Sequence, residues 1–353
     1  MALSLASLSY PFGGRPDHAE TMEVAPGVLW IRMQIPIPGL DFINLWLLEE
    51  DDGWAVVDTG LQSKKTIAWW EEIFSRYLKG KPVTRVICTH FHPDHMGLAG
   101  WFVSRWGDIP LWMTFGEWAF GRMIWLDIND KTPQSALDFY WRIGWDEAQL
   151  AEFKKRGFGR FSRVVAEVPF GIRRISHGER FTVGGSTWQV LVGEGHSPEH
   201  ACLYCPDKNL MISGDQVLPR ITPHIGIYPS EPEANPLGRY LDSLDRFRTL
   251  PEDLLILPAH GDPFYGLHAR LDQLHAHHAE RLSRLFDACE EPMTAARLIP
   301  SMFKRQLSPD DWSLASAEGL AHLHYLISDG KLRREVAEDG RYRYRRADCV
   351  AAA

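Results

Sequence analysis

The chain has 353 residues, of which 45% are hydrophobic and 24% charged, and its 38 basic and 46 acidic residues give a net charge of −8. These proportions are typical of a soluble globular protein with one large and one smaller domain, or with two domains, and the acidic balance argues against a chain that coats nucleic acid or an anionic membrane along its length. Five scattered cysteines indicate no disulfide framework, and no stretch predicts a signal peptide or membrane span, so we expect a cytoplasmic protein in a reducing compartment.

Apolar periodicity predicts strands and helices that alternate along most of the chain. Strands are expected at residues 28–33, 44–48, 54–58, 83–88, 110–113, 173–175, 180–183, 188–192, 201–204, 210–213 and 254–257. Helices are expected at residues 64–78, 100–106, over most of 115–157, and at 237–250. The order is β-rich, then α/β, then β-rich and α/β again, which predicts two sheets packed face to face with helices outside.

Changes in this pattern divide the chain into an N-terminal arm (residues 1–22), a large domain (23–265) and a C-terminal domain (266–350). In the last of these, a long helix, two shorter helices at 293–304 and 314–327, and a hairpin over residues 331–346 predict a small winged-helix-like fold. Within the large domain, residues 115–170 form a helical insertion rich in tryptophan and phenylalanine. Two interpretations of these aromatic residues have equal weight: a lid over a cleft that shapes an apolar pocket, or helices that pack onto the sandwich.

The stretch from Thr89 to His95 places four metal-ligating side chains directly after a buried strand. The alternate residues His90 and His92 can converge on one metal ion, whereas Asp94 and His95, further along the turn, can reach a second. Imidazole and carboxylate ligands suit zinc, iron and manganese. The alternative is a histidine-rich surface loop, because short motifs also occur by chance.

Three further residues follow predicted strands in the same way. His196 comes after the strand at 188–192, Asp215 after the one at 210–213, and His260 after the one at 254–257. Each has a glycine next to it, which lets the backbone turn sharply close to a metal ion. All three are therefore candidate ligands at the ends of strands.

In this order, the motifs resemble those of the metallo-β-lactamase superfamily over residues 28–261. They are Asp58–Thr59–Gly60, the His-x-His-x-Asp-His run at 90–95, His196, Asp215 and His260. The resemblance implies an αββα sandwich over the domain 23–265, with two divalent metal ions, zinc first and iron or manganese as alternatives. It places His90, His92 and His196 on one ion, Asp94, His95 and His260 on the other, and Asp215 between them. It also implies that Asp58 orients a ligand.

Two metal ions at such a centre share a hydroxide whose pKa is lowered toward neutrality, and this hydroxide attacks a carbonyl or phosphoryl centre. We therefore expect a hydrolase in which Asp215 bridges the ions and Asp94 also orients the hydroxide. Candidate acids for the leaving group are His200, His224 and Tyr228. For each of these three, a packing or surface role has at least equal weight.

The full ligand set is more similar to glyoxalase II-type thioesterases, lactonases and the RNase and phosphodiesterase branches than to true β-lactamases. Glu199 stands where glyoxalase II-like proteins have a glycine, which disfavours a glutathione thioester. If the aromatic insertion is a lid, an ester, thioester or lactone fits better than a polyanion, and we predict a small, apolar substrate of this kind. We leave a homodimer open.

The runner-up is a nucleic-acid phosphodiesterase or endoribonuclease that binds its substrate with the C-terminal domain. The hairpin at 331–346 has seven basic and three acidic residues, and arginine alternates with tyrosine near its end. Such interleaving is typical of a nucleic-acid-contacting wing. A half-buried hairpin with tyrosines inward and arginines in solvent shows the same alternation, and we favour that interpretation.

Overall fold

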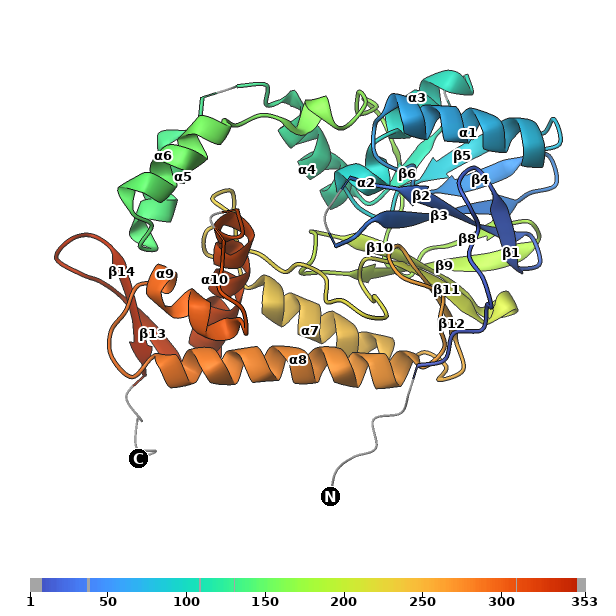
Figure 1. Cartoon of the computed structure of the whole chain (residues 1–353). Helices are drawn as coiled ribbons and strands as arrows, with labels where there is room; N and C mark the ends of the chain where they lie inside the picture. The colour runs from blue at the N-terminus through green and yellow to red at the C-terminus, as the bar shows by residue number, and fades with distance from the viewer. Residues whose placement is uncertain (1–7, 37–38, 108, 130, 309, 348–353) are drawn as a thin grey trace. The chain divides into compact units, whose positions relative to one another are not determined.

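The computed structural model describes residues 8–36, 39–107, 109–129, 131–308 and 310–347 (Figure 1). The first residues of the predicted N-terminal arm (1–7) and the last of the C-terminal domain (348–350) lie outside this range. Contacts divide the chain into two compact units. The first comprises residues 1–128, 159–223 and 245–271, and the second comprises 129–158, 224–244 and 272–353.

The first unit contains a seven-stranded sheet in which the strands follow their order in the chain. They are β1 (Thr21–Ala25), β2 (Val28–Gln34), β3 (Phe42–Glu49), β4 (Trp54–Val57), β5 (Val83–Ile87), β6 (Leu111–Met113) and β7 (Arg173–Arg174). β1 to β4 pair antiparallel, whereas β4 to β7 pair parallel. The change of direction at β4 brings the end of β5, where the ligand-rich turn begins, beside the end of β4.

Helices α1 (Lys64–Tyr77) and α3 (Ala99–Arg105) cover the outer face of this sheet (Figure 1). α1 begins at Ser63, whose side chain accepts a hydrogen bond from the backbone N–H of Thr66, a common N-cap. Its apolar stripe is buried, and Trp70 packs edge-on against Phe102 of α3 with ring centroids 4.9 Å apart. The helices and the sheet thereby share one apolar core.

The second sheet of the first unit has the order β12-β11-β10-β9-β8. Its strands are β8 (Arg180–Val183), β9 (Ser186–Gly193), β10 (His200–Cys205), β11 (Leu210–Gly214) and β12 (Leu255–Pro258). Only β11 and β12 pair parallel, so β9, β11 and β12 run in the same direction and end at one edge. Trp30 and Trp46 of the first sheet share a core with Trp188 and Leu203 of the second, which confirms the predicted sandwich of two sheets with helices.

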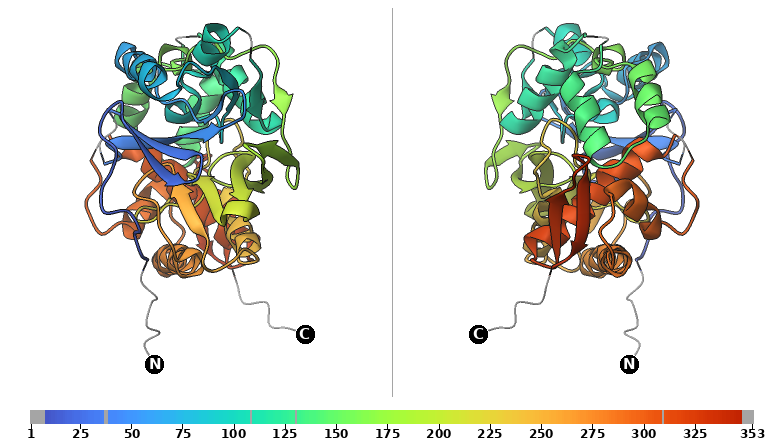
Figure 2. Two further views of the ribbon diagram at one scale, coloured as in Figure 1. Left: turned by 90° about the vertical axis from the view of Figure 1, so that its right-hand side faces the viewer. Right: turned by 90° about the vertical axis from the view of Figure 1, so that its left-hand side faces the viewer.

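The second unit contains α5 (Gln134–Arg142), α6 (Glu147–Arg156), α9 (Ala295–Leu298), α10 (Trp312–Ser328) and the hairpin β13 (Leu332–Val336) and β14 (Tyr342–Arg346). Figure 2 shows the two strands of the hairpin, in red, next to α10. The long helices α7 (Pro236–Phe247) and α8 (Leu267–Ala288) each contain residues of both units. The predicted helix at 293–304 is shorter than expected, because Pro300 has no N–H to continue the α-helix and a 3₁₀ turn follows α9.

The predicted insertion at 115–170 is divided between the two units. α4 (Phe115–Leu126) belongs to the first unit, whereas α5 and α6 belong to the second. There Trp145 is buried and donates a hydrogen bond from its indole N–H to Ser316 Oγ at 2.9 Å. A Cβ on Gly144 would lie 2.5 Å from Thr294 Oγ1, so the chain approaches α9 more closely than a side chain at this position permits. These contacts give Trp145, in the turn between α5 and α6, a packing role.

Candidate metal centre

The predicted ligands all lie just beyond the ends of strands in the first unit. His90 and His92 follow β5, and Asp94 and His95 lie in the short helix α2 (Pro93–Met96). The remaining three follow β9, β11 and β12: His196, Asp215 and His260. Parallel directions in each sheet therefore bring residues that are far apart in the sequence to one edge of the sandwich.

The structure gathers these seven side chains into two groups that could each hold a metal ion. In each group, one ligand atom from every residue lies within 4.8 Å of the others. The first consists of His90, His92, His196 and Asp215, and the second consists of Asp94, His95 and His260. His90 Nε2 lies 2.9 Å from His92 Nδ1 and 3.3 Å from His196 Nε2.

Asp215 lies between the two groups. Its Oδ2 is 3.4 Å from His196 Nε2 and 4.0 Å from His90 Nε2, both in the first group. The same oxygen is 3.6 Å from His95 Nε2, and Oδ1 is 3.5 Å from His260 Nε2, both in the second. One carboxylate thus faces ligands of both groups, which is the arrangement that a bridging ligand requires.

Unsatisfied atoms at the centre fit a pair of cations. His95 Nε2, His260 Nε2 and Asp215 Oδ1 are buried without a hydrogen-bond partner. Buried polar atoms are normally paired, and atoms that remain unpaired and converge on one place point to an ion. The donor set of imidazole nitrogens and carboxylate oxygens suits divalent metal ions.

Contacts behind the ligands orient their rings. His95 Nδ1 lies 2.8 Å from Asp58 Oδ2, and His260 Nδ1 lies 2.8 Å from the carbonyl oxygen of Phe42. Asp58 also accepts hydrogen bonds from the backbone N–H and the hydroxyl of Thr89. Each imidazole therefore donates from Nδ1 and directs its Nε2 into the centre. Asp58 has a φ of +59°, a strained conformation for a non-glycine residue that this network stabilises.

Burial and neighbouring charges shift the pKa values of the predicted ligands, often in opposite directions. Burial lowers the pKa of His92 to about 3. Burial also acts to lower the pKa of His95, but Asp58, Asp215 and Asp94 raise it well above the ordinary value. Conversely, burial acts to raise the pKa of Asp215, but His260 and His95 hold it well below its usual range. The Asp215 carboxylate is therefore ionised and able to bind cations.

The three candidate acids lie in different places. His200, in β10, is fully buried, and its Nε2 accepts a hydrogen bond from the backbone N–H of Asp215 at 3.1 Å. Its Nδ1 faces Cys202 Sγ at 3.7 Å, so both ring nitrogens face protein atoms and the geometry favours a positioning role. His224 and Tyr228 belong to the second unit, where their rings are 6.2 Å apart. An acid role for these two stays a prediction.

Glu117, a fully buried carboxylate in α4, was not among the site residues predicted from the sequence. It accepts hydrogen bonds from the loops that carry His92 and His196. Burial raises the pKa of Glu117 to about 7, although these hydrogen bonds act to lower it. A signal was present, because Glu117 is the one charged residue between Thr114 and Gly121. A lone charge in an apolar helix needs buried partners.

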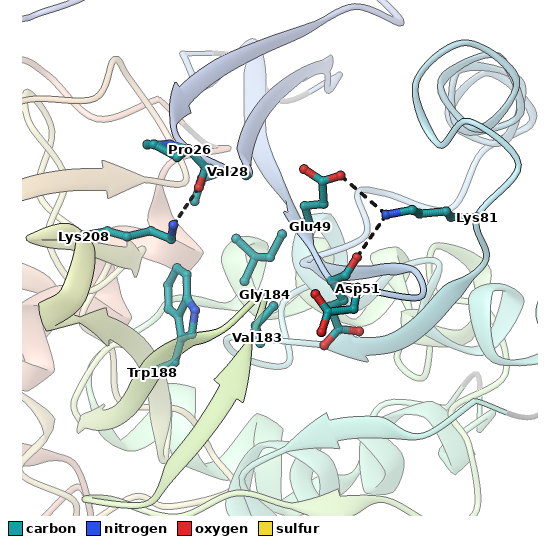
Figure 3. Close-up of a pocket in the computed structure, with 12 residues that line it drawn as sticks. Pro26, Val28, Glu49, Asp51, Lys81, Val183, Gly184, Trp188 and Lys208 are labelled. Carbon is teal, nitrogen blue, oxygen red and sulfur yellow. Dashed lines mark hydrogen bonds and ion pairs between the residues drawn. The ribbon is translucent and has the colours of Figure 1, made fainter.

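A pocket of about 440 Å³ lies at the other end of the strands (Figure 3). Its lining includes Glu49, Lys81, Trp188 and Lys208. Lys81 pairs with Glu49 at 3.6 Å, and Lys208 donates to the carbonyl oxygen of Pro26 at 2.7 Å. Both lysines therefore have protein partners, and the pocket contains none of the predicted ligands.

Arginines of the basic hairpin form ion pairs within the second unit. Arg345 lies 3.1 Å from Glu335, Arg343 lies 2.8 Å from Asp339, and Arg334 lies 2.9 Å from Glu233. Tyr344 is fully buried. This arrangement matches the half-buried hairpin that we favoured. The alternation of arginine and tyrosine therefore gives less support to a nucleic-acid-binding surface.

Comparison with known proteins agrees with this geometry. A family model described as the metallo-beta-lactamase superfamily matches residues 38–260, and one described as the metallo-beta-lactamase-like C-terminal domain matches residues 282–347. A solved beta-lactamase domain protein from Burkholderia ambifaria is 43% identical, with a TM-score of 0.89, and the alignment covers 96% of this chain and 98% of that one.

Two curated relatives are more distant. The probable metallo-hydrolase YqjP of Bacillus subtilis is 24% identical over 316 residues, which cover 85% of this chain and 92% of that protein. A linear primary-alkylsulfatase of a Pseudomonas species is 27% identical over 237 residues, or 62% of this chain. The match spans less than half (42%) of the alkylsulfatase. Among the described residues, no helix is long and apolar enough to cross a membrane.

Proposed function

Since the chain belongs to the metallo-beta-lactamase superfamily and is a metal-dependent hydrolase of that family, we propose that it hydrolyses a small, apolar ester, thioester or lactone. The observation that carries this proposal is a group of phenylalanine rings beside a centre that can hold two cations. We call these rings, of Phe91, Phe120 and Phe161, the aromatic wall. Phe91 packs against His92 with ring centroids 4.6 Å apart. An apolar group that contacts this wall would place its ester bond next to the predicted ligands.

The wall continues away from the centre. Phe91 contacts Phe120 of α4 at 4.8 Å and Phe161 at 6.3 Å, and all three rings are partly exposed. Further along α4, Met123 and Leu126 are about half exposed, at 52% and 55%. Such a surface favours an acyl or alkyl chain over a polyanion.

The chain's own residues provide the rest of the reaction site. Asp215 faces both groups of ligands, and Asp94 Oδ2, 3.3 Å from His260 Nε2, is a second carboxylate within reach of a nucleophilic water. When bound, two divalent ions supply Lewis acidity toward the substrate oxygen and lower the pKa of water. Because the ligands are histidines and carboxylates, with histidines in the majority, we propose zinc, with iron and manganese as alternatives.

A second candidate substrate is a linear alkyl sulfate. The relative from Pseudomonas is named as a linear primary-alkylsulfatase, and an alkyl chain suits the aromatic wall as well as an acyl chain does. The two candidates differ only in the ester group that would lie at the metal centre.

A hydrolysis screen on zinc-, iron- and manganese-reconstituted protein tests the proposal. It uses aryl esters of increasing chain length, an acyl thioester, a lactone, a linear alkyl sulfate, a phosphodiester and single-stranded RNA. We expect turnover of a carboxylic ester, thioester or lactone. Each methylene of the substrate that becomes buried should stabilise the transition state by about 0.8 kcal/mol, which raises kcat/KM roughly fourfold. Phe120→Ala should reduce this dependence on chain length, whereas turnover of the phosphodiester or RNA alone would refute the proposal.

A further inference from the structure

A carboxylate from a third element lies between the loops that carry His92 and His196. Glu117, in the first turn of α4, accepts hydrogen bonds at Oε1 from Ser197 Oγ and from the backbone N–H of Glu199, both at 2.6 Å. Its Oε2 accepts a hydrogen bond from the backbone N–H of Phe91 at 3.0 Å. One buried side chain therefore joins the backbone next to His92 to the loop that follows His196.

Hydrogen bonds between Glu199 and the start of α4 also hold this helix against the loop that carries His196. Glu199 Oε2 accepts a hydrogen bond from the backbone N–H of Gly116 at 2.7 Å, and Thr114 Oγ1 donates to the Glu199 carbonyl oxygen at 2.8 Å. A Cβ on Gly116 would lie 2.9 Å from the Glu199 carboxyl carbon. Glu199, the residue that departs from the glyoxalase II pattern, thus fixes the helix that carries Glu117.

The loop of His92 approaches the same helix. A Cβ on Gly121 would lie 3.2 Å from Phe91 Cβ and 3.0 Å from Met96 Sδ, so a side chain at this position would displace one of them. The two ligand loops and α4 are therefore packed closely enough that neither loop can shift without breaking a hydrogen bond to Glu117.

The second group of ligands has different supports. His95 is oriented by Asp58 and His260 by the Phe42 carbonyl oxygen. Glu117 makes none of its three hydrogen bonds to these residues. Its influence on the two groups should therefore be unequal.

We propose that Glu117 is a positioning residue that sets the separation of His92 and His196, and with it the metal affinity of the group formed by His90, His92 and His196. The group formed by Asp94, His95 and His260 does not depend on it. Only the accompanying loss of turnover rests on the proposed function.

The test compares Glu117→Gln with the wild-type protein and with Glu50→Gln. The Glu117→Gln substitution keeps the size of the side chain but replaces one accepting oxygen by an NH₂ group that must face a donor of one of the two loops. Glu50 is a matched control, because its carboxylate is also largely buried (11% exposed), pairs with Arg85 and accepts from Thr84 Oγ1, but it lines the pocket at the other end of the strands. Zinc affinity is measured by competition with a chromophoric chelator, and anomalous diffraction locates each ion.

We expect Glu117→Gln to bind one zinc ion with roughly 10–100-fold lower affinity. The weakened ion should be the one at His90, His92 and His196, while the other ion and both ions of Glu50→Gln stay as in the wild type. Turnover should fall at limiting zinc and recover with excess zinc. Wild-type affinity for both ions, or an equal loss at both groups, would overturn the proposal.

If Glu117→Gln does not fold, Ser197→Ala takes its place, because it removes one donor from the same carboxylate. We expect a smaller loss of affinity at the same group, and no loss would overturn the proposal. Zinc binding is measured without substrate, so the two proposals fail separately. A protein that hydrolyses no tested ester but loses one ion in Glu117→Gln would refute the proposed function and support the role of Glu117.

Discussion

Two clusters of buried histidines in this chain show what distinguishes a metal centre from a packed histidine pair. At the metal centre, His95 and His260 direct Nε2 atoms without hydrogen-bond partners toward Asp94 and Asp215. In the second unit, His278 Nδ1 lies 3.1 Å from His322 Nε2, and His322 Nδ1 lies 2.8 Å from the Glu318 carbonyl oxygen. The nitrogens that face each other in this pair therefore satisfy each other, although His278 Nε2 on the far side of its ring has no hydrogen-bond partner, whereas His95 Nε2 and His260 Nε2 point at carboxylates without forming a hydrogen bond.

Both clusters are buried, but the charges around them differ. Burial lowers the pKa of His322 to about 3; the hydrogen bond with the Glu318 carbonyl oxygen does not offset this effect, and the positive charge of Arg281 adds to it. At the metal centre, three carboxylates overcome burial and raise the pKa of His95. Carboxylates that converge with imidazoles are what turn a buried cluster into a binding site for cations.

The carboxylate that faces both ligand groups should give the largest effect. We expect Asp215→Ala to reduce kcat/KM by at least roughly 10²–10³-fold, the scale of removing one preorganised electrostatic group, and to lower the bound metal below two ions per chain. Steady-state kinetics and metal analysis on the same sample check both. Full turnover with a single ion bound would contradict a shared site.

Asp58→Asn tests whether the residue that orients the His95 ring affects metal binding. Asparagine keeps the shape of the side chain but removes the charge that holds the His95 Nδ1–H and the Thr89 hydroxyl. We expect metal affinity at the group of Asp94, His95 and His260 to fall by about 10–100-fold. Chelator competition measures this, and unchanged affinity would show that the Asp58 charge is not needed to orient His95.

The packed pair predicts a pH dependence of stability. His322 has a folded pKa of about 3, below the ordinary 6.5, so the unfolded chain takes up a proton that the folded chain does not. Stability from this group is complete above pH 6.5 and is lost as the pH falls toward 3, with roughly 2 kcal/mol lost between pH 7 and 5. Urea unfolding of metal-free wild type and His322→Gln at both pH values should show a smaller pH effect in the variant. An equal pH effect in both would mean that His322 protonates freely in the folded state.

Much of the metal centre was predictable because its ligands are local or follow strands. His90, His92, Asp94 and His95 lie within six positions, and an apolar strand before each of the other ligands indicates that they share an edge. The alternating pattern of β2 and the apolar run of β3 likewise predicted two strands of the first sheet. In these places, short-range sequence determines where a side chain points.

The remaining features depend on how distant segments pack. Nothing next to Glu117 in the sequence predicts that it accepts hydrogen bonds from Phe91 and Ser197, which lie 26 and 80 positions away. Likewise, the insertion reads as one helical segment, and only contacts such as that of Trp145 with Ser316 show that α5 and α6 pack in the second unit. The hairpin left two interpretations open partly for the same reason, since the partner of Arg334 is Glu233, 101 positions away.

The smallest effect should come from that hairpin. Arg343 and Arg345 have side chains that are 27% and 30% exposed, and their partners Asp339 and Glu335 neutralise them. Such surface pairs contribute about 0–1 kcal/mol each, so Arg343→Glu with Arg345→Glu should lower stability slightly. We expect no salt-dependent binding of single-stranded RNA by the wild type in a fluorescence anisotropy titration, and hence no change in the double variant. Binding that falls steeply with salt and disappears in the variant would instead make the hairpin a substrate-binding surface.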